Sequence, residues 1–432
     1  MHELERVRFH PPSSRQLLAR VLDERELVMA IQHLPPRALT KLIEHVGLED
    51  AGELIALATT EQLEKVFDED LWRSPRPGED EVFDAARFVL WLEVMLEAGA
   101  AFTARRVAEL PEDLVVDALH RQILVVDMDA LGAEIAVLGE DADQLEKVLG
   151  GSLHHELDTY RVIARSHDGW DAILAVLVAL DEQHHDVLVR ILERCCALSS
   201  RDVEDHGGLY DVLSSAETLA TDVAADREQR RAGEGFIAPS SAAAFLRYAA
   251  KTELATLRRE GRDPITRAYF RELAPPPPIA LPAAAEGLVA LLRANAVLDL
   301  PEPALLLPAS DSPEARFRGA LSELLDRDPV LHQRRRTELV YLANVLVAGA
   351  DAGGRAFRPA EAAAAVITTC GLGLAYLAGE DGKPDHEIMT RDGADTLFRI
   401  GWHLLAERHG DPAAALLPVA AWKQQEEDRC VR

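Results

Sequence analysis

Histidine and carboxylate side chains gather in the middle of this 432-residue chain, between His154 and His206. Six of its fifteen histidines fall in that interval. Glu182 and His185 form an E-x-x-H pair, which a helix would point to one side. Imidazole and carboxylate ligands suit zinc, iron or nickel. One pair is half of what a di-iron carboxylate bundle needs, because such bundles use the motif twice.

A second arrangement of possible ligands depends on a strand. If residues 154–160 are extended, His154, Glu156 and Asp158 share one face and could gather a cation. The competing interpretation is an ordinary solvated helix start at Asp181–Asp186, and we favour it. We therefore predict no cofactor and keep a divalent metal as the alternative. The candidate metal ligands are Glu182, His185 and His154.

Standard catalytic signatures are absent from the sequence. Gly379–Lys383 lacks the spacing and the hydroxyl of a phosphate-binding loop, and Gly371–Gly373 lacks the third glycine of a dinucleotide fingerprint. Cys195 and Cys196 fall near the end of an expected helix, where the helix dipole disfavours a thiolate. We interpret Arg334–Arg336 as a solvated helix start, with an anion grip as the alternative. The sequence indicates no catalytic or cofactor-binding residue, and a binding protein is favoured over an enzyme.

The composition favours a helical protein of the cytoplasm. Hydrophobic residues make up 48% of the chain and aromatic residues only 5%, whereas strands are enriched in aromatic and β-branched residues. The four cysteines lack metal-finger spacing and fit reduced thiols. Met1–Arg6 is acidic where a signal peptide is basic. Ala362–Gly379 is uncharged but short and rich in small residues, so we expect a buried helix and no membrane span.

The net charge of −28 is unevenly distributed, because residues 51–150 hold 23 acidic and 8 basic residues. Such a field repels phosphate backbones, so nucleic acid is not expected as a partner. The acidic region is either a solvated surface, a docking face for a basic protein or a weak divalent-cation site. If it is a docking face, reversing the charges of Asp68, Glu69 and Asp70 should weaken capture of the partner.

Three segments in the first quarter begin a helix in the same way, at Pro36, Thr60 and Pro111. Proline fits the first helical turn because its missing N–H would be unpaired there, and threonine can cap through its hydroxyl. We also expect one helix from Ser14 to Gln32 and a small β-hairpin that includes His155–Ala164. The predicted fold is mainly α: an N-terminal superhelical array of short helices, a middle region with this hairpin, and a helical C-terminal domain.

Pro275–Pro278 marks a semi-rigid spacer in this arrangement. The predicted segments are an acidic short-helix repeat domain at 1–122, a mixed, mostly helical domain at 123–273, a proline-rich linker at 274–313 and a helical domain at 314–432.

Several segments resemble a bacterial family catalogued only as a domain of unknown function. They are Leu34–Pro36 followed by Gly47–Ala51, Gly235–Pro239, Glu338–Asn344, Ala365–Cys370 and Leu397–Trp402. They span nearly all of the chain, and the resemblance implies no particular activity. Residues 30–120, with short helices opening on Leu-Pro, are also similar to the cytoplasmic N-terminal helical domain of MgtE-type magnesium transporters. That resemblance implies a short-helix superhelix and magnesium sensing, although the transporter's membrane helices are missing.

We therefore expect a cytoplasmic interaction or scaffold protein that binds a basic partner along its acidic helices. The alternatives are a divalent-cation-responsive regulator and an enzyme with an unrecognised, metal-dependent site around His185.

Overall fold

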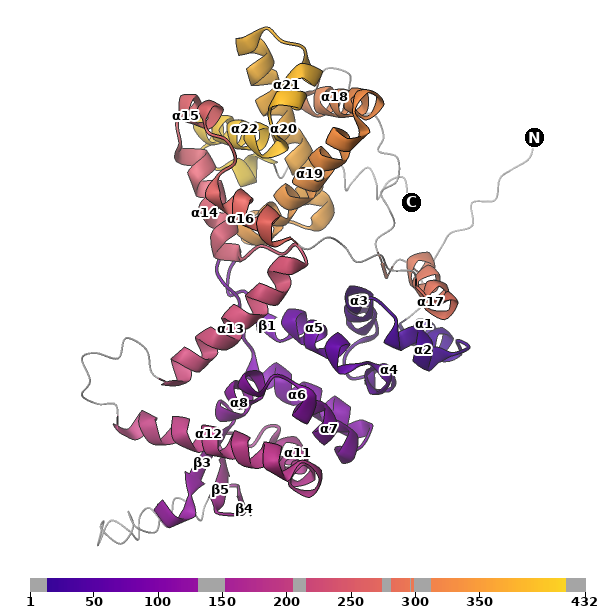
Figure 1. Ribbon diagram of the computed structural model, residues 1–432, viewed down its shortest axis with the longest axis vertical. Coiled ribbons are helices and arrows are strands. Elements are labelled where there is room, and N and C mark those ends of the chain that lie inside the picture. The colour runs from indigo at the N-terminus through magenta and orange to yellow at the C-terminus, as the bar shows by residue number, and fades with distance from the viewer. Residues whose placement is uncertain are drawn as a thin grey trace. The chain divides into compact units, whose positions relative to one another are not determined.

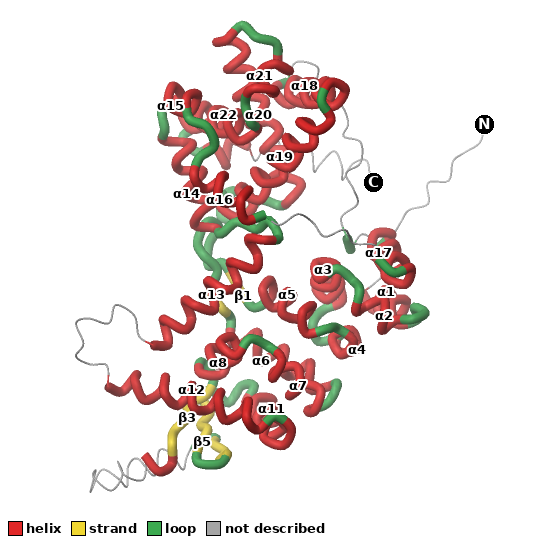
Figure 2. Tube along the Cα trace, viewed as in Figure 1, coloured by secondary structure: helices red, strands yellow, loops and turns green. Residues whose placement is uncertain are grey.

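The chain is mainly helical in a computed structural model that describes residues 14–130, 152–204, 215–273, 281–295, 297–298 and 312–416. Among these residues, strands form only a two-stranded and a three-stranded sheet (Figure 2). The predicted mainly α class with a small hairpin is confirmed.

The chain divides into two compact units, each built from three separate segments. The N-terminal unit comprises Met1–Trp72, Phe83–Arg227 and Pro277–Pro303, and the C-terminal unit comprises Arg73–Val82, Glu228–Pro276 and Ala304–Arg432. The four-segment division predicted from the sequence stays a prediction. Several sequence features lie outside the described residues. They are the Pro275–Pro278 spacer, most of the second proline-rich stretch of the predicted linker (300–313), His206, and the last cysteine of the chain, Cys430.

Short helices make up most of the described part of the N-terminal unit, together with one three-stranded sheet. Its helices are α1 (Ser14–Leu22), α2 (Leu27–Gln32), α3 (Pro36–Val46), α4 (Gly52–Leu57), α5 (Thr60–Asp70), α6 (Ala85–Glu97), α7 (Ala100–Glu109), α8 (Glu112–His120), α11 (Trp170–Gln183), α12 (His185–Glu204) and α17 (Ala283–Ala294) (Figure 1).

Local capping explains where several of these helices begin. Pro36 occupies the first turn of α3, and Gly47 ends that helix at a φ of 98°. Thr59 caps α5 by accepting a hydrogen bond from the backbone N–H of Gln62, whose side chain accepts from Thr59 N–H in return. The three predicted helix starts are thus confirmed, α8 beginning one residue after Pro111.

The predicted single helix from Ser14 to Gln32 is wrong. Helix α1 ends at Leu22, and α2 begins at Leu27 after Glu26 takes a left-handed conformation with a φ of 59°. An α-helix cannot continue through such a residue. The break lets Leu17 and Val21 of α1 and Ile31 of α2 all be buried in the same core.

The middle of the N-terminal unit holds an antiparallel sheet in the order β3-β5-β4. Strand β5 (Tyr160–Ala164) pairs with β3 (Ile123–Asp127) on one side and with β4 (His154–Leu157) on the other. Strand β4 stops at Leu157, because Asp158 has a φ of 53° and turns the chain back. The expected strand through residue 160 is therefore a hairpin, and Asp158 lies in its turn.

The C-terminal unit is helical in its described part. Its helices are α14 (Pro239–Lys251), α15 (Leu254–Arg259), α16 (Pro264–Glu272), α18 (Pro313–Arg327), α19 (Pro329–Gly349), α20 (Pro359–Asp381), α21 (Asp385–Arg391) and α22 (Ala394–His409), while α13 (Ser215–Gly233) belongs in part to each unit. The strands β1 (Trp72–Arg73) and β2 (Val82–Phe83) form the two-stranded sheet, and each has one residue in each unit.

Helix α20 is the central helix of this unit and packs against α18, α19 and α22. By length and composition alone it is also the one helix among the described residues that could cross a membrane. Half of its most apolar window is buried inside the protein, which agrees with a core helix. Gly373 of α20 and Gly401 of α22 let the two backbones approach closely, since a Cβ at either position would lie within about 2 Å of a carbonyl oxygen.

Candidate functional site

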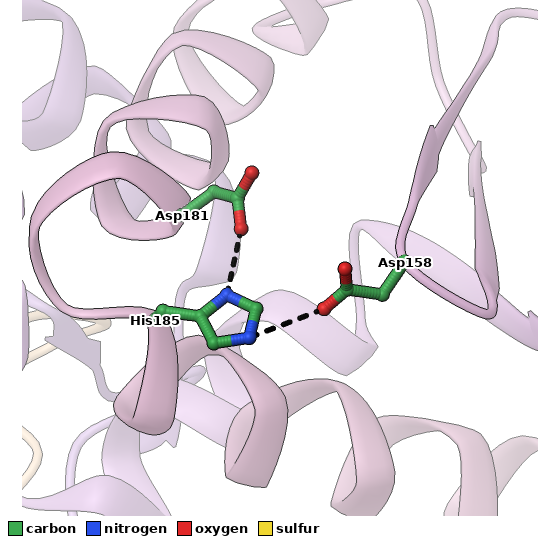
Figure 3. A group of neighbouring side chains, drawn as sticks. All are labelled: Asp158, Asp181 and His185. Atoms are coloured by element: carbon green, nitrogen blue, oxygen red, sulfur yellow. Dashed lines mark hydrogen bonds and ion pairs between the residues drawn. The ribbon is translucent and has the colours of Figure 1, made fainter.

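Three polar side chains meet around His185 at the junction of two helices and a hairpin turn (Figure 3). Nδ1 of His185 lies 2.8 Å from Oδ1 of Asp181, and Nε2 lies 3.3 Å from Oδ2 of Asp158. Asp181 belongs to the last turn of α11, and His185 is the first residue of α12. We call these three residues the His185 cluster.

Both carboxylates raise the pKa of the His185 imidazole. The hydrogen bond to Asp181 raises the pKa of His185 above its ordinary value, and the charge of Asp158 raises it further. A protonated ring donates from both nitrogens, so it can bond to both carboxylates at once. The cluster is solvent-exposed, with just over half of the His185 side chain accessible.

The other two predicted metal ligands lie outside this cluster. Helix α11 ends at Gln183, and His184 breaks the helical path with a φ of −140°. Glu182 and His185 therefore do not share one helix face, and the i,i+4 pair of Asp181 and His185 forms instead. His154 bonds through Nδ1 to the carbonyl of Ser152. The i,i+4 spacing of Asp181 and His185 can be read from the sequence. The approach of Asp158 to His185 cannot, because it depends on the turn between β4 and β5.

The donor geometry of the His185 cluster limits how it can hold a metal. A metal ion takes one nitrogen of an imidazole, and the other nitrogen usually donates to a second acceptor. Because the two aspartates lie at opposite nitrogens, one of them would contact the ion and the other would orient the ring. The cluster thus offers one nitrogen and one carboxylate directly, fewer than the three protein ligands of typical zinc enzymes.

The two buried cysteines among the described residues are not activated thiols. Cys195 and Cys370 are fully buried, and burial raises the pKa of the Cys195 thiol to about 12. A catalytic thiol needs the opposite shift. Cys195 lies within α12 and contacts the carbonyl of Val116 through its sulfur.

A buried ionic network occupies the interior of the C-terminal unit, and we call it the Glu338 network. Glu338 is completely buried and accepts bonds from Arg335 at 3.0 and 2.9 Å and from the backbone N–H of Ala394 at 2.9 Å. Arg262 also donates to Glu338. The predicted solvated start at Arg334–Arg336 is thus wrong for its middle residue, because Arg335 is only 4% exposed.

Asp395 lies beside this network with its carboxylate unsatisfied. Both of its side-chain oxygens are buried without a hydrogen bond, and the nearest cations are Arg399 at 3.6 Å and Arg262 at 3.8 Å. Burial raises the pKa of Asp395 above its ordinary value. The network stiffens the junction of α19 and α22. The carboxylates of Glu338 and Asp395 at its centre are closed to solvent, so they suit structure more than catalysis.

Exposed carboxylates gather on the N-terminal unit around α4 and α6. Glu49, Asp50, Glu53, Glu93 and Glu97 are all exposed. Within the described part of the chain, none of these five carboxylates forms an ion pair. Helix α4 packs against α6, and the carboxylate of Glu97 lies beside Gly52. We call these five residues the α4–α6 acidic surface.

The acidic residues chosen from the sequence for a charge-reversal test are not equivalent to this surface. Asp68 is only 6% exposed. Asp70 accepts hydrogen bonds from Arg87 at 2.7 Å and from Trp91 at 2.6 Å. Reversing either charge would disturb the fold, so a change in binding would not report on a docking face.

Comparison with known proteins gives a family match without an activity. Residues 3–206 are similar to a family described as Family of unknown function (DUF6178). The predicted resemblance to a domain-of-unknown-function family is confirmed for this stretch, which is less than half of the 432 residues. Neither a curated protein nor a solved structure matches the chain. The His185 cluster and the α4–α6 acidic surface both lie within the matched stretch.

Proposed function

We propose that the N-terminal unit is a protein-interaction module that binds a basic partner through the α4–α6 acidic surface. The observation that carries this proposal is the concentration of five exposed carboxylates without an ion-pair partner among the described residues. Uncompensated charge of one sign steers an oppositely charged partner and accelerates its association.

The two helices that carry most of the α4–α6 acidic surface are rigid. Leu54 and Ile55 of α4 and Trp91 and Leu92 of α6 are fully or almost fully buried, so their helices are anchored in the core. Side chains presented by such helices lose little freedom when a partner binds. The surface thus combines charge with preorganisation, which favours a specific contact over diffuse attraction.

Charge reversal at Glu49, Glu53 and Glu93 to lysine is expected to weaken binding of a lysine-rich peptide about tenfold at low salt. The physical reason is the loss of attraction together with new repulsion from the introduced cations. Fluorescence anisotropy of the labelled peptide against the full chain measures this change, and a salt titration should show a weaker dependence for the variant.

The matched control carries Asp222→Lys, Asp226→Lys and Asp326→Lys. These three aspartates are exposed on α13 and α18, and the substitutions change the net charge by the same amount without altering α4 or α6. The control should bind the peptide within about twofold of the unmodified chain. Equal weakening in both triple variants would mean that net charge alone attracts the peptide, which contradicts a defined surface. Proteins captured from the native host by the control but lost with the first variant then identify the partner.

The second candidate function is a divalent-cation-responsive regulator, favoured by the His185 cluster. The similarity of residues 30–120 to the cytoplasmic domain of MgtE-type magnesium transporters stays a prediction, and that stretch does not contain the His185 cluster. An imidazole and a carboxylate prefer a transition metal such as zinc over magnesium. In this proposal zinc takes the place of the proton on one ring nitrogen of His185, between that nitrogen and the facing aspartate.

Zinc is expected to raise the thermal midpoint of the full chain, since a ligand that prefers the native state stabilises it. His185→Ala should abolish the rise, whereas His154→Ala, an exposed histidine outside the cluster, should leave it intact. Magnesium should give no comparable rise. A midpoint that zinc does not move, or that it moves equally in His185→Ala, excludes regulation through this cluster.

The cytoplasm is the compartment we propose for both functions. Cys195, Cys196 and Cys370 are free thiols, as is usual for cytoplasmic proteins. We also propose that the protein is bacterial and that its N-terminal short helices form a superhelical repeat. An enzymatic role around His185 is the least supported alternative, because the cluster provides two direct ligands and no adjacent nucleophile among the described residues.

A further inference from the structure

A pocket of about 730 Å³ opens on the C-terminal unit, where α15, the ends of α20 and α21, and the first turn of α22 come together. This volume is in the range of sites for small organic molecules. Two of its lining side chains are the carboxylates Asp381 and Asp392, and four are cationic: Arg258, Arg259, Lys383 and Arg391. Such a concentration is unexpected in a chain with a net charge of −28.

Two of these cations are fixed by carboxylates. Asp381 accepts hydrogen bonds from Arg258 at 2.6 Å and from Arg391 at 2.7 Å, and so holds the two guanidinium groups on either side of its carboxylate. Arg391 bonds at 2.9 and 2.7 Å to Asp392 as well. These contacts neutralise Arg258 and Arg391 and hold one wall of the pocket in place.

The other two cations are not held by a bond to a carboxylate, although the charge of Lys383 adds to the hydrogen bond from Arg391 in lowering the pKa of Asp381. Arg259 donates through Nε to the carbonyl of Ala255 at 3.1 Å, which leaves the terminal nitrogens of its guanidinium group for a ligand. In the described residues, neither Arg259 nor Lys383 forms an ion pair. Two positive charges in a concave site attract an anion more strongly than the same charges on a flat surface.

The remaining lining adds a hydroxyl donor and an apolar wall. Thr396 lies in the first turn of α22, and its Oγ1 accepts a bond from Arg399 at 3.3 Å. The Thr396 hydroxyl proton is therefore available for an acceptor in the pocket. Leu377 and Ile400 also line the pocket and offer apolar surface.

We propose that this pocket binds a small organic phosphate. The phosphoryl dianion lies between Arg259 and Lys383, and the organic part packs against Leu377 and Ile400. A dianion matches two cations that form no ion pair among the described residues, and guanidinium groups suit phosphate oxygens. The pocket differs from a phosphate-binding loop, because side chains and not a glycine-rich backbone supply the donors.

Isothermal titration calorimetry of the full chain with phenyl phosphate tests the proposal. We expect phenyl phosphate to bind more tightly than inorganic phosphate, which lacks the apolar part, and than benzoate, which lacks the second charge. Arg259→Ala and Lys383→Ala should each weaken phenyl phosphate binding about tenfold. Both side chains are exposed, so both variants should keep the thermal midpoint of the parent chain.

Arg247→Ala is the matched control. Arg247 is exposed on α14 and donates to a carbonyl four residues earlier, as Arg259 does, but it does not line the pocket. This variant should bind phenyl phosphate within about twofold of the unmodified chain. The proposal is overturned if phenyl phosphate does not bind at millimolar concentration, if benzoate binds equally well, or if Arg247→Ala weakens binding as much as Arg259→Ala. If one pocket variant fails to fold, the other decides the outcome.

Discussion

Gly401→Ala is expected to lower the free energy of unfolding of the C-terminal unit by about 3 kcal/mol. A Cβ at this position of α22 would lie 1.9 Å from the carbonyl oxygen of Thr369 and 2.9 Å from its carbonyl carbon in α20. Both are backbone atoms, so no side-chain rotation relieves the clash and the helices must separate. Their separation would loosen the contacts of Phe398 and Leu374, which are fully buried.

Urea denaturation of the full chain, followed by far-ultraviolet circular dichroism, measures this loss as a lower midpoint for the affected transition. Gly319→Ala is the matched control, because nothing lies within 4 Å of a Cβ at that position of α18. Alanine has the higher helix propensity, so the control should gain up to about 1 kcal/mol. An unchanged or raised midpoint for Gly401→Ala would show that α20 and α22 do not approach as closely as described.

The close approach of α20 and α22 also explains why the uncharged stretch Ala362–Gly379 of α20, a helix long and apolar enough to cross a membrane, is rich in small residues. Small residues in this helix serve contact between backbones, and Gly373 meets the carbonyl of Leu397 in the same way that Gly401 meets Thr369. The sequence alone shows the small residues but not their partners, because those partners come from another helix.

Helix starts could be predicted because capping is local. Pro36 and Thr59 act within one turn of the residues they cap, so the sequence contains the whole interaction. Glu26 is different, because a left-handed glutamate is uncommon and is imposed by the burial of α1 and α2 on one core. The predicted continuous helix therefore failed at a position where tertiary packing overrides local preference.

The candidate site was predicted in the same incomplete way. His185 was identified from its type and neighbours, but the expected partner Glu182 lies in α11, the helix that ends before His185 begins α12. Asp158 joins the cluster only because it turns the β4–β5 hairpin. The acidic bias of the N-terminal unit was equally clear from composition, whereas the fixed role of Asp70 depends on Arg87 and Trp91.

The Glu338 network is the feature least visible in the sequence, and its removal should have the other large effect. Glu338→Ala is expected to destabilise the C-terminal unit by about 4 kcal/mol. The substitution leaves the buried guanidinium of Arg335 without its carboxylate and removes the acceptor for the Ala394 N–H at the start of α22. Gly393 has no side chain to replace that cap. Urea denaturation of the full chain measures the loss.

Glu323→Ala provides the comparison for an exposed ion pair. Glu323 bonds to Arg327 four residues later in α18 with its side chain 43% exposed, so its removal should change the free energy of unfolding by less than about 1 kcal/mol. An equally small effect for Glu338→Ala would contradict the buried network.

A double variant separates the two sources of the expected loss. Replacing both Glu338 and Arg335 by methionine removes the buried charge pair and fills the space with apolar atoms. If the unpaired guanidinium of Arg335 accounts for most of the lost stability, the double variant should be more stable than Glu338→Ala. The reason is that exchanging a buried ion pair for apolar residues is often neutral. Arg262, whose side chain is 25% exposed, can then turn to solvent. If the lost cap at Ala394 dominates, the double variant should stay as unstable as the single one, and α22 should be held chiefly by the carboxylate of Glu338.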